Sequence, residues 1–190
     1  IPVAGYKKAV DLSYYSIGET RFDQNLLSSK RHIGGKMENE LFIKRITLKA
    51  NLEKLAGKIN AAQWDEGNAL PDGEYSADSL EWYLRGEGNF FFVCFIGSDL
   101  AGMASAQLLP NAYGKHSTFY VDELDTAVNF RRRGVATALM NEIKLLADET
   151  DSYELWLGTE KTNTGAQRLY EKLAPDSVEE FVGYTWDLED

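Results

Sequence analysis

The sequence is poor in the residues that build disulfides and zinc sites. Its 190 residues include one cysteine, Cys94, and two histidines, His32 and His116. A single cysteine excludes a disulfide framework within the chain. So few sulfur and imidazole ligands also argue against a Cys/His zinc site. We therefore expect a functional site without a metal, and we expect Cys94 to be a small core residue rather than a nucleophile.

Long apolar runs are also missing. No stretch reaches the roughly 18 apolar residues that a membrane-spanning helix needs, and no signal-peptide pattern opens the chain. Hydrophobic residues make up 44% of the sequence and charged residues 26%, which is typical of a globular domain and excludes wholesale disorder. We therefore expect a cytoplasmic protein that does not bind membranes.

Basic residues are scarce relative to acidic ones. The chain has 20 basic and 30 acidic side chains, a net charge of -10. Six basic and three acidic side chains give residues 1–36 a charge of +3, so the remainder carries -13. Such a chain is a poor candidate for nucleic-acid binding. We expect no nucleic-acid partner; the acidity serves either solubility or attraction of a polycation.

The sequence divides into two parts. Residues 1–36 show no sustained helical or strand period, whereas a regular pattern follows Met37 directly. We therefore expect an N-terminal extension or leader at 1–36, to which we assign no role, and one domain at 37–190.

Within that domain, apolar periodicity and turn signals predict an alternation of strands and helices. The predicted strands are at 41–48, 90–96, 100–109, 118–126, 153–159 and 180–188, and the predicted helices are at 50–62, 76–85, 134–148 and 163–173. This order predicts an α/β protein built around a single mixed sheet.

The chemically most informative segment joins the strand at 118–126 to the helix that follows it. Its core is Arg131-Arg132-Arg133-Gly134-Val135-Ala136. Small residues at Gly134 and Ala136 let the backbone approach a ligand, and a helix N-terminus offers unpaired N–H groups and a positive dipole end. The combination suits a pyrophosphate. The alternative is a solvated cluster of positive charge.

Two motifs carry a family resemblance. Arg131, Gly134 and Ala136 fill the Arg/Gln-x-x-Gly-x-Gly/Ala pattern of the acetyl-CoA loop in the GNAT superfamily of N-acetyltransferases. Residues 163–173 resemble that superfamily's Asn-x-x-Ala-x-x-Leu-Tyr-x-x-Leu helix. Both motifs stand in the expected order, and the similarity spans about residues 40–190. It implies the GNAT fold, a single, mostly antiparallel central sheet flanked by helices.

A narrower resemblance is to the small aminoglycoside 3-N-acetyltransferases. It rests on Leu108-Leu109-Pro110, on Tyr120-Val121-Asp122-Glu123-Leu124 and on the arginine-rich loop. One departure is Ala174-Pro175, which follows the second motif where the family usually has glycine.

The resemblance implies acetyl-CoA as cofactor. The strand's end would pair with the pantetheine arm, and a backbone N–H, that of Leu124, would stabilise an oxyanion. Asn163 either contacts the cofactor or caps its helix. The implied cofactor-binding residues are Leu124, Asp125, Thr126, Arg131, Arg132, Arg133, Gly134, Val135, Ala136, Thr137 and Asn163.

Two residues are candidates for proton transfer. Glu123 matches an acidic position of the aminoglycoside enzymes and is the candidate general base, directly or through a water; the alternative is a substrate anchor or ion-pair partner. Tyr170 is the candidate general acid for the departing thiolate, and the alternative is a core tyrosine. A regular strand would place Asp122 on the face opposite Glu123.

The leading hypothesis for the acceptor is an aminoglycoside, which a carboxylate-lined cleft would recognise. The alternatives are a polyamine, another small amine, a protein amine, or a non-catalytic module that binds acyl-CoA. A homodimer stays open as an assembly. The candidate substrate-binding carboxylates are Glu123, Asp65, Glu66, Asp72 and Asp187.

Overall fold

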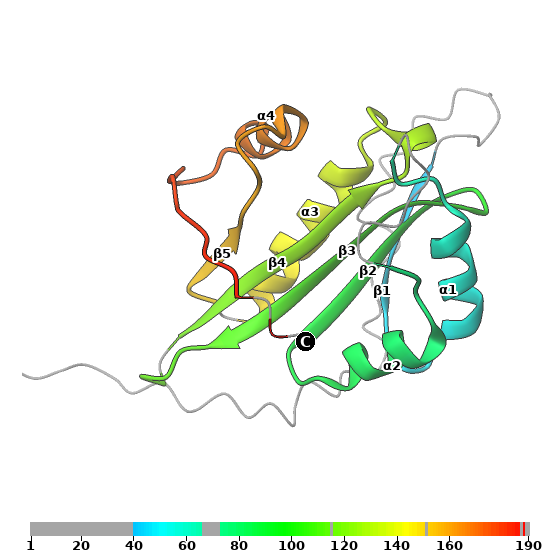
Figure 1. Cartoon of the computed structure of the whole chain (residues 1–190), viewed down its shortest axis with the longest axis horizontal. Helices are drawn as coiled ribbons and strands as arrows, with labels where there is room; N and C mark the ends of the chain where they lie inside the picture. The colour runs from blue at the N-terminus through cyan, green and yellow to red at the C-terminus, as the bar shows by residue number, and fades with distance from the viewer. Residues whose placement is uncertain (1–39, 66–72, 115, 151, 187, 189–190) are drawn as a thin grey trace, which may run out of the picture.

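A computed structural model describes residues 40–65, 73–114, 116–150, 152–186 and 188 (Figure 1). The extension expected at 1–36 therefore lies outside the described residues. No helix in the described part of the chain is long and apolar enough to cross a membrane.

A single five-stranded sheet forms the centre of the molecule. The strands lie in the order β1-β2-β3-β4-β5, and all neighbours are antiparallel except β4 and β5, which are parallel. This arrangement confirms the predicted mixed, mostly antiparallel sheet. The strands are β1 (Leu41–Ile46), β2 (Asn89–Ile96), β3 (Asp99–Pro110), β4 (Ser117–Thr126) and β5 (Glu154–Leu157).

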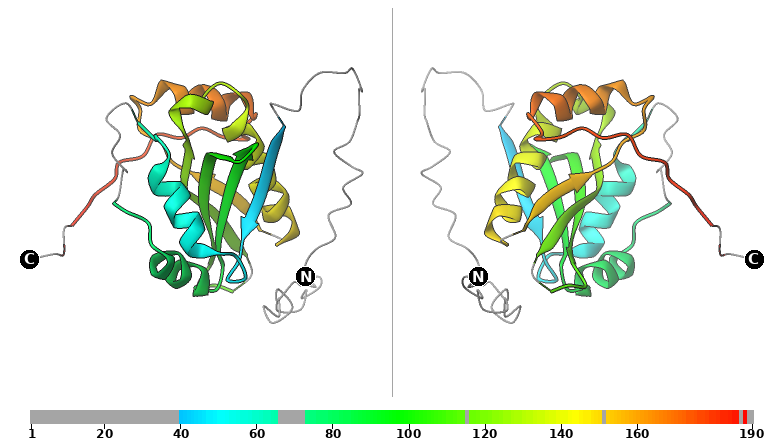
Figure 2. Two further views of the ribbon diagram at one scale, coloured as in Figure 1. Left: turned by 90° about the vertical axis from the view of Figure 1, so that its right-hand side faces the viewer. Right: turned by 90° about the vertical axis from the view of Figure 1, so that its left-hand side faces the viewer.

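Helices cover the sheet on both faces. Helices α1 and α2 pack on one face, α3 packs on the other, and α4 lies at the end of the molecule where β4 ends and α3 begins (Figures 1 and 2). A short 3-10 helix, η2 (Val128–Phe130), leads from β4 toward α3. The α-helices are α1 (Leu52–Ala61), α2 (Ala77–Arg85), α3 (Val135–Glu149) and α4 (Thr164–Lys172).

Local signals explain where the short helices begin. Ser76 caps α2 in a reciprocal capping box with Ser79, because each side chain bonds the other residue's backbone N–H. The side chain of Asn163 caps α4 by accepting a hydrogen bond from the backbone N–H of Ala166 at 3.1 Å. These caps satisfy backbone donors that have no partner inside the helix.

The sheet separates two hydrophobic clusters. Under α3, side chains such as Phe119, Leu139 and Ile143 are fully buried, and Cys94 lies among them. Cys94 is fully buried, which confirms the expected core position, and burial raises the pKa of its thiol to about 11. The second cluster lies under α1 and α2 and includes Met103 from β3.

The final strand predicted at 180–188 is wrong. None of the described residues in that segment belongs to a strand, and Phe181, Tyr184 and Trp186 expose 62%, 78% and 75% of their surfaces rather than joining a core. Alternating apolar residues predict a strand only where a partner edge completes the ladder. Here the segment runs past β5 without pairing with it (Figure 1).

Candidate functional site

Strands β4 and β5 pair along only the first half of β4. Their parallel pairing runs from Thr118, opposite Glu154, to Val121, opposite Leu157. Among the described residues, no strand pairs with that side of β4 from 122 to 126. An unpaired strand edge offers backbone groups to an extended ligand. Three of the predicted cofactor-binding residues, Leu124, Asp125 and Thr126, lie on this stretch.

A β-bulge sets the direction of the acidic side chains on β4. Val121 pairs with Ala106 and Glu123 pairs with Ser105, so Asp122 is an extra residue between two consecutive pairs. The expectation that Asp122 faces away from Glu123 was made for a regular strand, and it does not hold here because β4 is bulged. The bulge turns both carboxylates into the same pocket.

That pocket lies between α2 and the sheet and has a volume of about 240 Å³. Four of its nine lining residues are aromatic, and its only acidic lining residues are Asp122 and Glu123 of β4. The lining residues are Tyr75, Ser79, Leu80, Trp82, Tyr83, Phe91, Ser105, Asp122 and Glu123. An aromatic pocket with carboxylates suits a cation, because both ring faces and carboxylates attract positive charge.

Two hydroxyl groups hold the carboxylate of Glu123. The Tyr75 hydroxyl donates to Oε2 at 3.1 Å, and the Ser105 hydroxyl donates to the same oxygen at 3.3 Å. These bonds fix the direction of the side chain from two elements, the segment before α2 and strand β3. A carboxylate held in this way is available as a base or as an anchor for an amine.

Tyr83 forms another part of the pocket wall. Its hydroxyl donates to the backbone carbonyl of Ala106 at 3.1 Å. Burial raises the pKa of Tyr83 to about 12, and the carboxylates of Asp122 and Glu123 contribute to the rise. Tyr83 therefore stays a neutral hydrogen-bond donor at neutral pH.

Tyr170 approaches β4 from the other side. It is half-buried and packs against the cluster under α3, whereas Glu123 points into the pocket on the α2 side. Burial, followed by the carboxylate of Asp125, raises the pKa of the Tyr170 phenol. The phenol thus stays protonated at neutral pH, as a proton donor requires.

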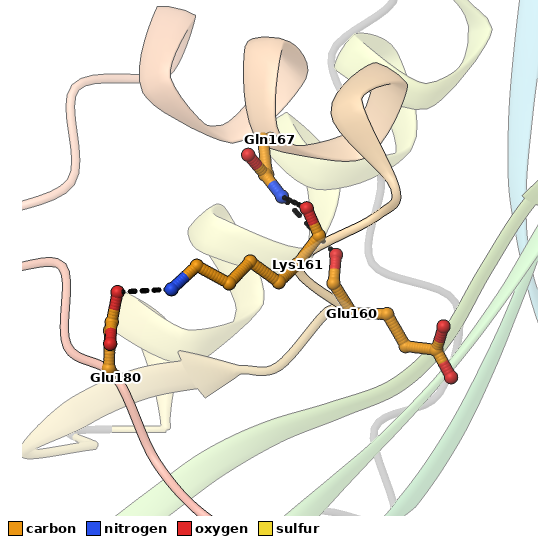
Figure 3. Close-up of polar contacts among 4 residues, drawn as sticks. All are labelled: Glu160, Lys161, Gln167 and Glu180. Atoms are coloured by element: carbon orange, nitrogen blue, oxygen red, sulfur yellow. Dashed lines mark hydrogen bonds and ion pairs between the residues drawn. The ribbon is translucent and has the colours of Figure 1, made fainter.

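Polar contacts fix the start of α4, the helix that carries Tyr170. The side-chain amide of Gln167 donates to the backbone carbonyls of Glu160 and Lys161 at 3.2 and 2.8 Å (Figure 3). Lys161 forms an exposed ion pair with Glu180 at 2.7 Å, which ties the segment after α4 to the same loop (Figure 3). These contacts hold the N-terminal end of α4 and so help to position Tyr170.

The N-terminus of α3 has the features of an anion site. Gly134 is the N-cap with φ 84° and makes no side-chain capping bond, so the N–H groups of the first turn have no partner within the helix. A Cβ at Gly134 would meet only Leu41 Cδ1, at 3.9 Å, which leaves open space beside the backbone. Arg132 also has a positive φ, 64°. A pyrophosphate fits this backbone arrangement.

The arginines of this loop have different roles. Arg131 donates to the backbone carbonyls of Trp64 at 2.7 Å and Thr126 at 3.4 Å, so its guanidinium ties the loop to the segment after α1 and to the end of β4. Arg133 lies over the ring of Phe130 at 5.5 Å. Two of the predicted cofactor-binding residues thus bond backbone groups of the protein with their side chains. Arg131 bonds the carbonyls of Trp64 and Thr126, and Asn163 bonds the N–H of Ala166.

Of the carboxylates predicted to bind substrate, one lies in the pocket. Glu123 lines the pocket, whereas Asp65 is described but is not among the lining residues. Glu66, Asp72 and Asp187 lie outside the described residues. The lining residues that sequence reasoning missed are Tyr75, Ser79, Leu80, Trp82, Tyr83, Phe91, Ser105 and Asp122. The one local signal for them was the capped short helix α2, whose sequence includes two adjacent aromatic residues.

Comparison with known families and proteins gives a consistent result. The profile of the Acetyltransferase (GNAT) family matches residues 56–174. Among curated proteins, an uncharacterized N-acetyltransferase, YedL of Escherichia coli (strain K12), is 29% identical over 119 residues, which cover 62% of this chain and 70% of YedL.

Solved structures share the fold at lower identity. An aminoglycoside acetyltransferase from an uncultured soil metagenomic sample, in complex with sisomicin, has a TM-score of 0.70 and 18% identity over 81% of this chain and 100% of its own. AAC(6')-Iy with a bisubstrate analog has a TM-score of 0.61 and 16% identity over 78% and 99%. A ribosomal-protein-alanine N-acetyltransferase from Brucella melitensis biovar Abortus 2308 has a TM-score of 0.60 and 18% identity over 79% and 100%.

Proposed function

The chain belongs to the GNAT acetyltransferase family, and from that membership we propose that it transfers an acetyl group from acetyl-CoA to an amino group of an aminoglycoside and so confers resistance. The 3-amino group is the proposed position of transfer. The family membership makes the chain an acetyltransferase, and the aminoglycoside acceptor is the proposed refinement.

The observation that carries this refinement is the pocket beside the bulge of β4. Two carboxylates, Asp122 and Glu123, enter one pocket whose other walls are largely aromatic. An acceptor with several ammonium groups gains charge-assisted hydrogen bonds there, and the acidity of the whole chain favours its approach. The likeness to an aminoglycoside acetyltransferase solved with sisomicin supports the same acceptor class.

Two parts of the chain would hold acetyl-CoA, which supplies an activated thioester when it is bound. The backbone N–H groups at the start of α3, beside Gly134, suit its pyrophosphate. The side of β4 from 122 to 126, with which no described strand pairs, suits its extended pantetheine arm. Arg131 holds these two parts together, because it bonds the carbonyl of Thr126 at the end of β4.

The proton transfers fall to residues on opposite sides of β4. Glu123 takes a proton from the acceptor's ammonium, directly or through a water, while Tyr75 and Ser105 keep its carboxylate in place. Tyr170 donates its proton to the departing sulfur; burial and, after it, the carboxylate of Asp125 raise the pKa of this phenol, so the proton is present beforehand. Glu123 would thus act on the amine from one face of β4, and Tyr170 would act on the sulfur from the other.

A protein amine is the second candidate acceptor. It is supported by the likeness to a ribosomal-protein-alanine N-acetyltransferase, whose TM-score is close to that of AAC(6')-Iy. The cofactor loop is the same for both acceptors, so only the pocket distinguishes them. A polyamine would use the same carboxylates as an aminoglycoside.

Release of free thiol from acetyl-CoA tests the proposal. The purified chain is assayed with gentamicin-like aminoglycosides, spermidine and basic peptides. For the acceptor with the highest kcat/KM, mass spectrometry and NMR locate the acetylated amine. We expect aminoglycosides to be preferred. Preference for peptides would overturn the aminoglycoside assignment in favour of the protein-amine acceptor. Tight CoA binding without thiol release from any amine would identify a non-catalytic module instead.

A further inference from the structure

No helix of the described ranges covers one part of the sheet face beside the pocket. Helices α1 and α2 pack on β2 and β3, and Figure 1 shows β5 and part of β4 extending to the left of them. Phe119 and Val121 point into the cluster under α3, so Tyr120, between them, points to the opposite face. There Tyr120 stacks on its register partner Trp156, with ring centroids 5.5 Å apart and planes inclined by 23°.

The Tyr120–Trp156 stack remains accessible from solvent. Trp156 exposes 43% of its surface, which is unusual for a tryptophan on a sheet. The ring of Phe181 lies next to the ring of Trp156, with centroids 5.7 Å apart and planes inclined by 57°. Gly158 permits this approach, because a Cβ there would lie 3.1 Å from Phe181 Cζ and 3.3 Å from Trp156 Cη2. Three rings thus form a continuous aromatic surface on this face.

Carboxylates lie at both ends of the stack. Asp122 interacts with the side chain of Tyr120 and at the same time lines the pocket of Glu123. At the other end Glu154, two residues before Trp156, accepts a hydrogen bond from Thr118 at 2.9 Å. Two residues span roughly 6–7 Å along a strand. Asp122 therefore links the aromatic surface to the pocket, and a carboxylate lies on either side of the stack.

We propose that the Tyr120–Trp156 stack is a second subsite of the acceptor site, which binds a distal ammonium group while the reacting amine lies beside Glu123. This inference rests on the proposed acetyl transfer to an amine and specifies the acceptor further. Ring faces attract cations, and carboxylates beside them strengthen the attraction. Charge complementarity thus selects a cationic ligand over an apolar segment or a second copy of this acidic chain.

The subsite makes the number of amines in the acceptor matter. An acceptor with two separated ammonium groups contacts the pocket and the stack together, so the second contact adds to affinity without changing the reacting group. An acceptor with one amine contacts the pocket alone. We therefore expect specificity for polyamino acceptors to reside in Trp156 and Tyr120 and to appear mainly in KM.

The test compares gentamicin, which carries several amines, with glucosamine, which carries one. Trp156→Ala is expected to lower kcat/KM for gentamicin by about 2-fold to 30-fold through KM and to leave glucosamine unchanged. Trp156→Phe, which keeps a ring, should restore part of the loss. Tyr113→Ala, an exposed tyrosine in the loop between β3 and β4, is the matched control. Equal losses for both acceptors, or none, would overturn the proposal.

Two measurements separate this inference from the proposed function. Calorimetric binding of gentamicin to the unmodified chain and to Trp156→Ala needs no turnover, so weaker binding by the variant supports the subsite even if no amine is acetylated. A circular-dichroism spectrum and melting temperature establish that the variant folds, and Glu154→Lys supplies a second variant with a reversed charge. If Trp156→Ala converts a dimer to a monomer without changing gentamicin binding, the surface joins two copies and the subsite is refuted.

Discussion

The hydroxyl of Tyr75 donates a hydrogen bond to Oε2 of Glu123 at 3.1 Å, although the two residues are 48 positions apart. Asn60 of α1 fixes the backbone of Tyr75 with two hydrogen bonds, one to its carbonyl at 2.8 Å and one from its N–H at 2.9 Å. The ring of Tyr75 also packs against the ring of Phe91, with centroids 6.1 Å apart. The segment before α2 thereby reaches the acidic residue of β4 on which the proposed chemistry depends.

Removing this contact should weaken catalysis without unfolding the chain. Tyr75→Phe keeps the ring but deletes the donor to Glu123. We expect kcat/KM to fall by about tenfold, because a hydrogen bond to a charged group contributes roughly 1.5–3 kcal/mol and Ser105 still holds the same oxygen. The exposed Tyr113→Phe serves as control in the same thiol-release assay. Full activity in Tyr75→Phe would mean that this bond does not position the base.

Tyr170→Phe should lower turnover far more than cofactor affinity. General acid catalysis contributes typically 10²-fold to 10⁴-fold, and the Tyr170 phenol stays protonated because burial and Asp125 raise its pKa. We expect kcat to fall by about a hundredfold while calorimetry finds CoA bound as before. A variant with unchanged kcat would leave Tyr170 as a packing residue of α4.

Gly134→Glu should abolish the anion site at the start of α3. The substitution adds a negative charge and forces a side chain onto a backbone with φ 84°. We expect the dissociation constant for CoA to rise by about tenfold or more. Gly97→Glu is the matched control, because Gly97 also has a positive φ, 61°, but lies in the turn between β2 and β3. Equal CoA affinity in both variants would contradict the pyrophosphate assignment.

Tyr83 should make the chain lose stability in alkali. Its pKa rises from 10.0 to about 12 on folding, so the unfolded chain releases this proton first as the pH increases. The contribution of Tyr83 to the free energy of unfolding is constant below pH 10 and should fall by up to about 2 kcal/mol between pH 10 and 12. Tyr83→Phe should flatten that decline in urea unfolding experiments, at a cost of about 1 kcal/mol at neutral pH for its lost bond to Ala106. Identical alkaline slopes in both proteins would disprove this assignment.

Sequence reasoning succeeded where short-range signals decide the structure. The helices predicted at 76–85 and 163–173 begin where Ser76 and Asn163 cap α2 and α4, because a capping side chain bonds a backbone N–H within the first turn. The loop from Arg131 to Gly134 was likewise predicted as the entry to α3. Even Ala174, where the family usually has glycine, has a glycine-like φ of 52°, so the turn survives at some cost in strain.

It failed where distant segments decide the structure. The bulge at Asp122 depends on how β4 pairs with β3, and no residue within β4 specifies it. The aromatic walls of the pocket come from α2, the segment before it and Phe91 of β2, which meet β4 only after folding. The strand predicted at 180–188 had the right alternation but no partner edge. These long-range pairings determine the site, whereas the motifs determine only which residues are available for it.

The most direct test of the account is the rate of acetyl transfer by Glu123→Gln. The substitution keeps an oxygen that can accept from Tyr75 and Ser105 but cannot take a proton from an ammonium group. Thiol release from acetyl-CoA is measured with the best acceptor, beside Glu87→Gln, which changes an exposed glutamate outside the pocket. We predict a loss of kcat of about a hundredfold or more for Glu123→Gln, with CoA affinity and melting temperature unchanged. Turnover equal to that of the control variant would contradict the role of Glu123 as base and, with it, the mechanism proposed for this site.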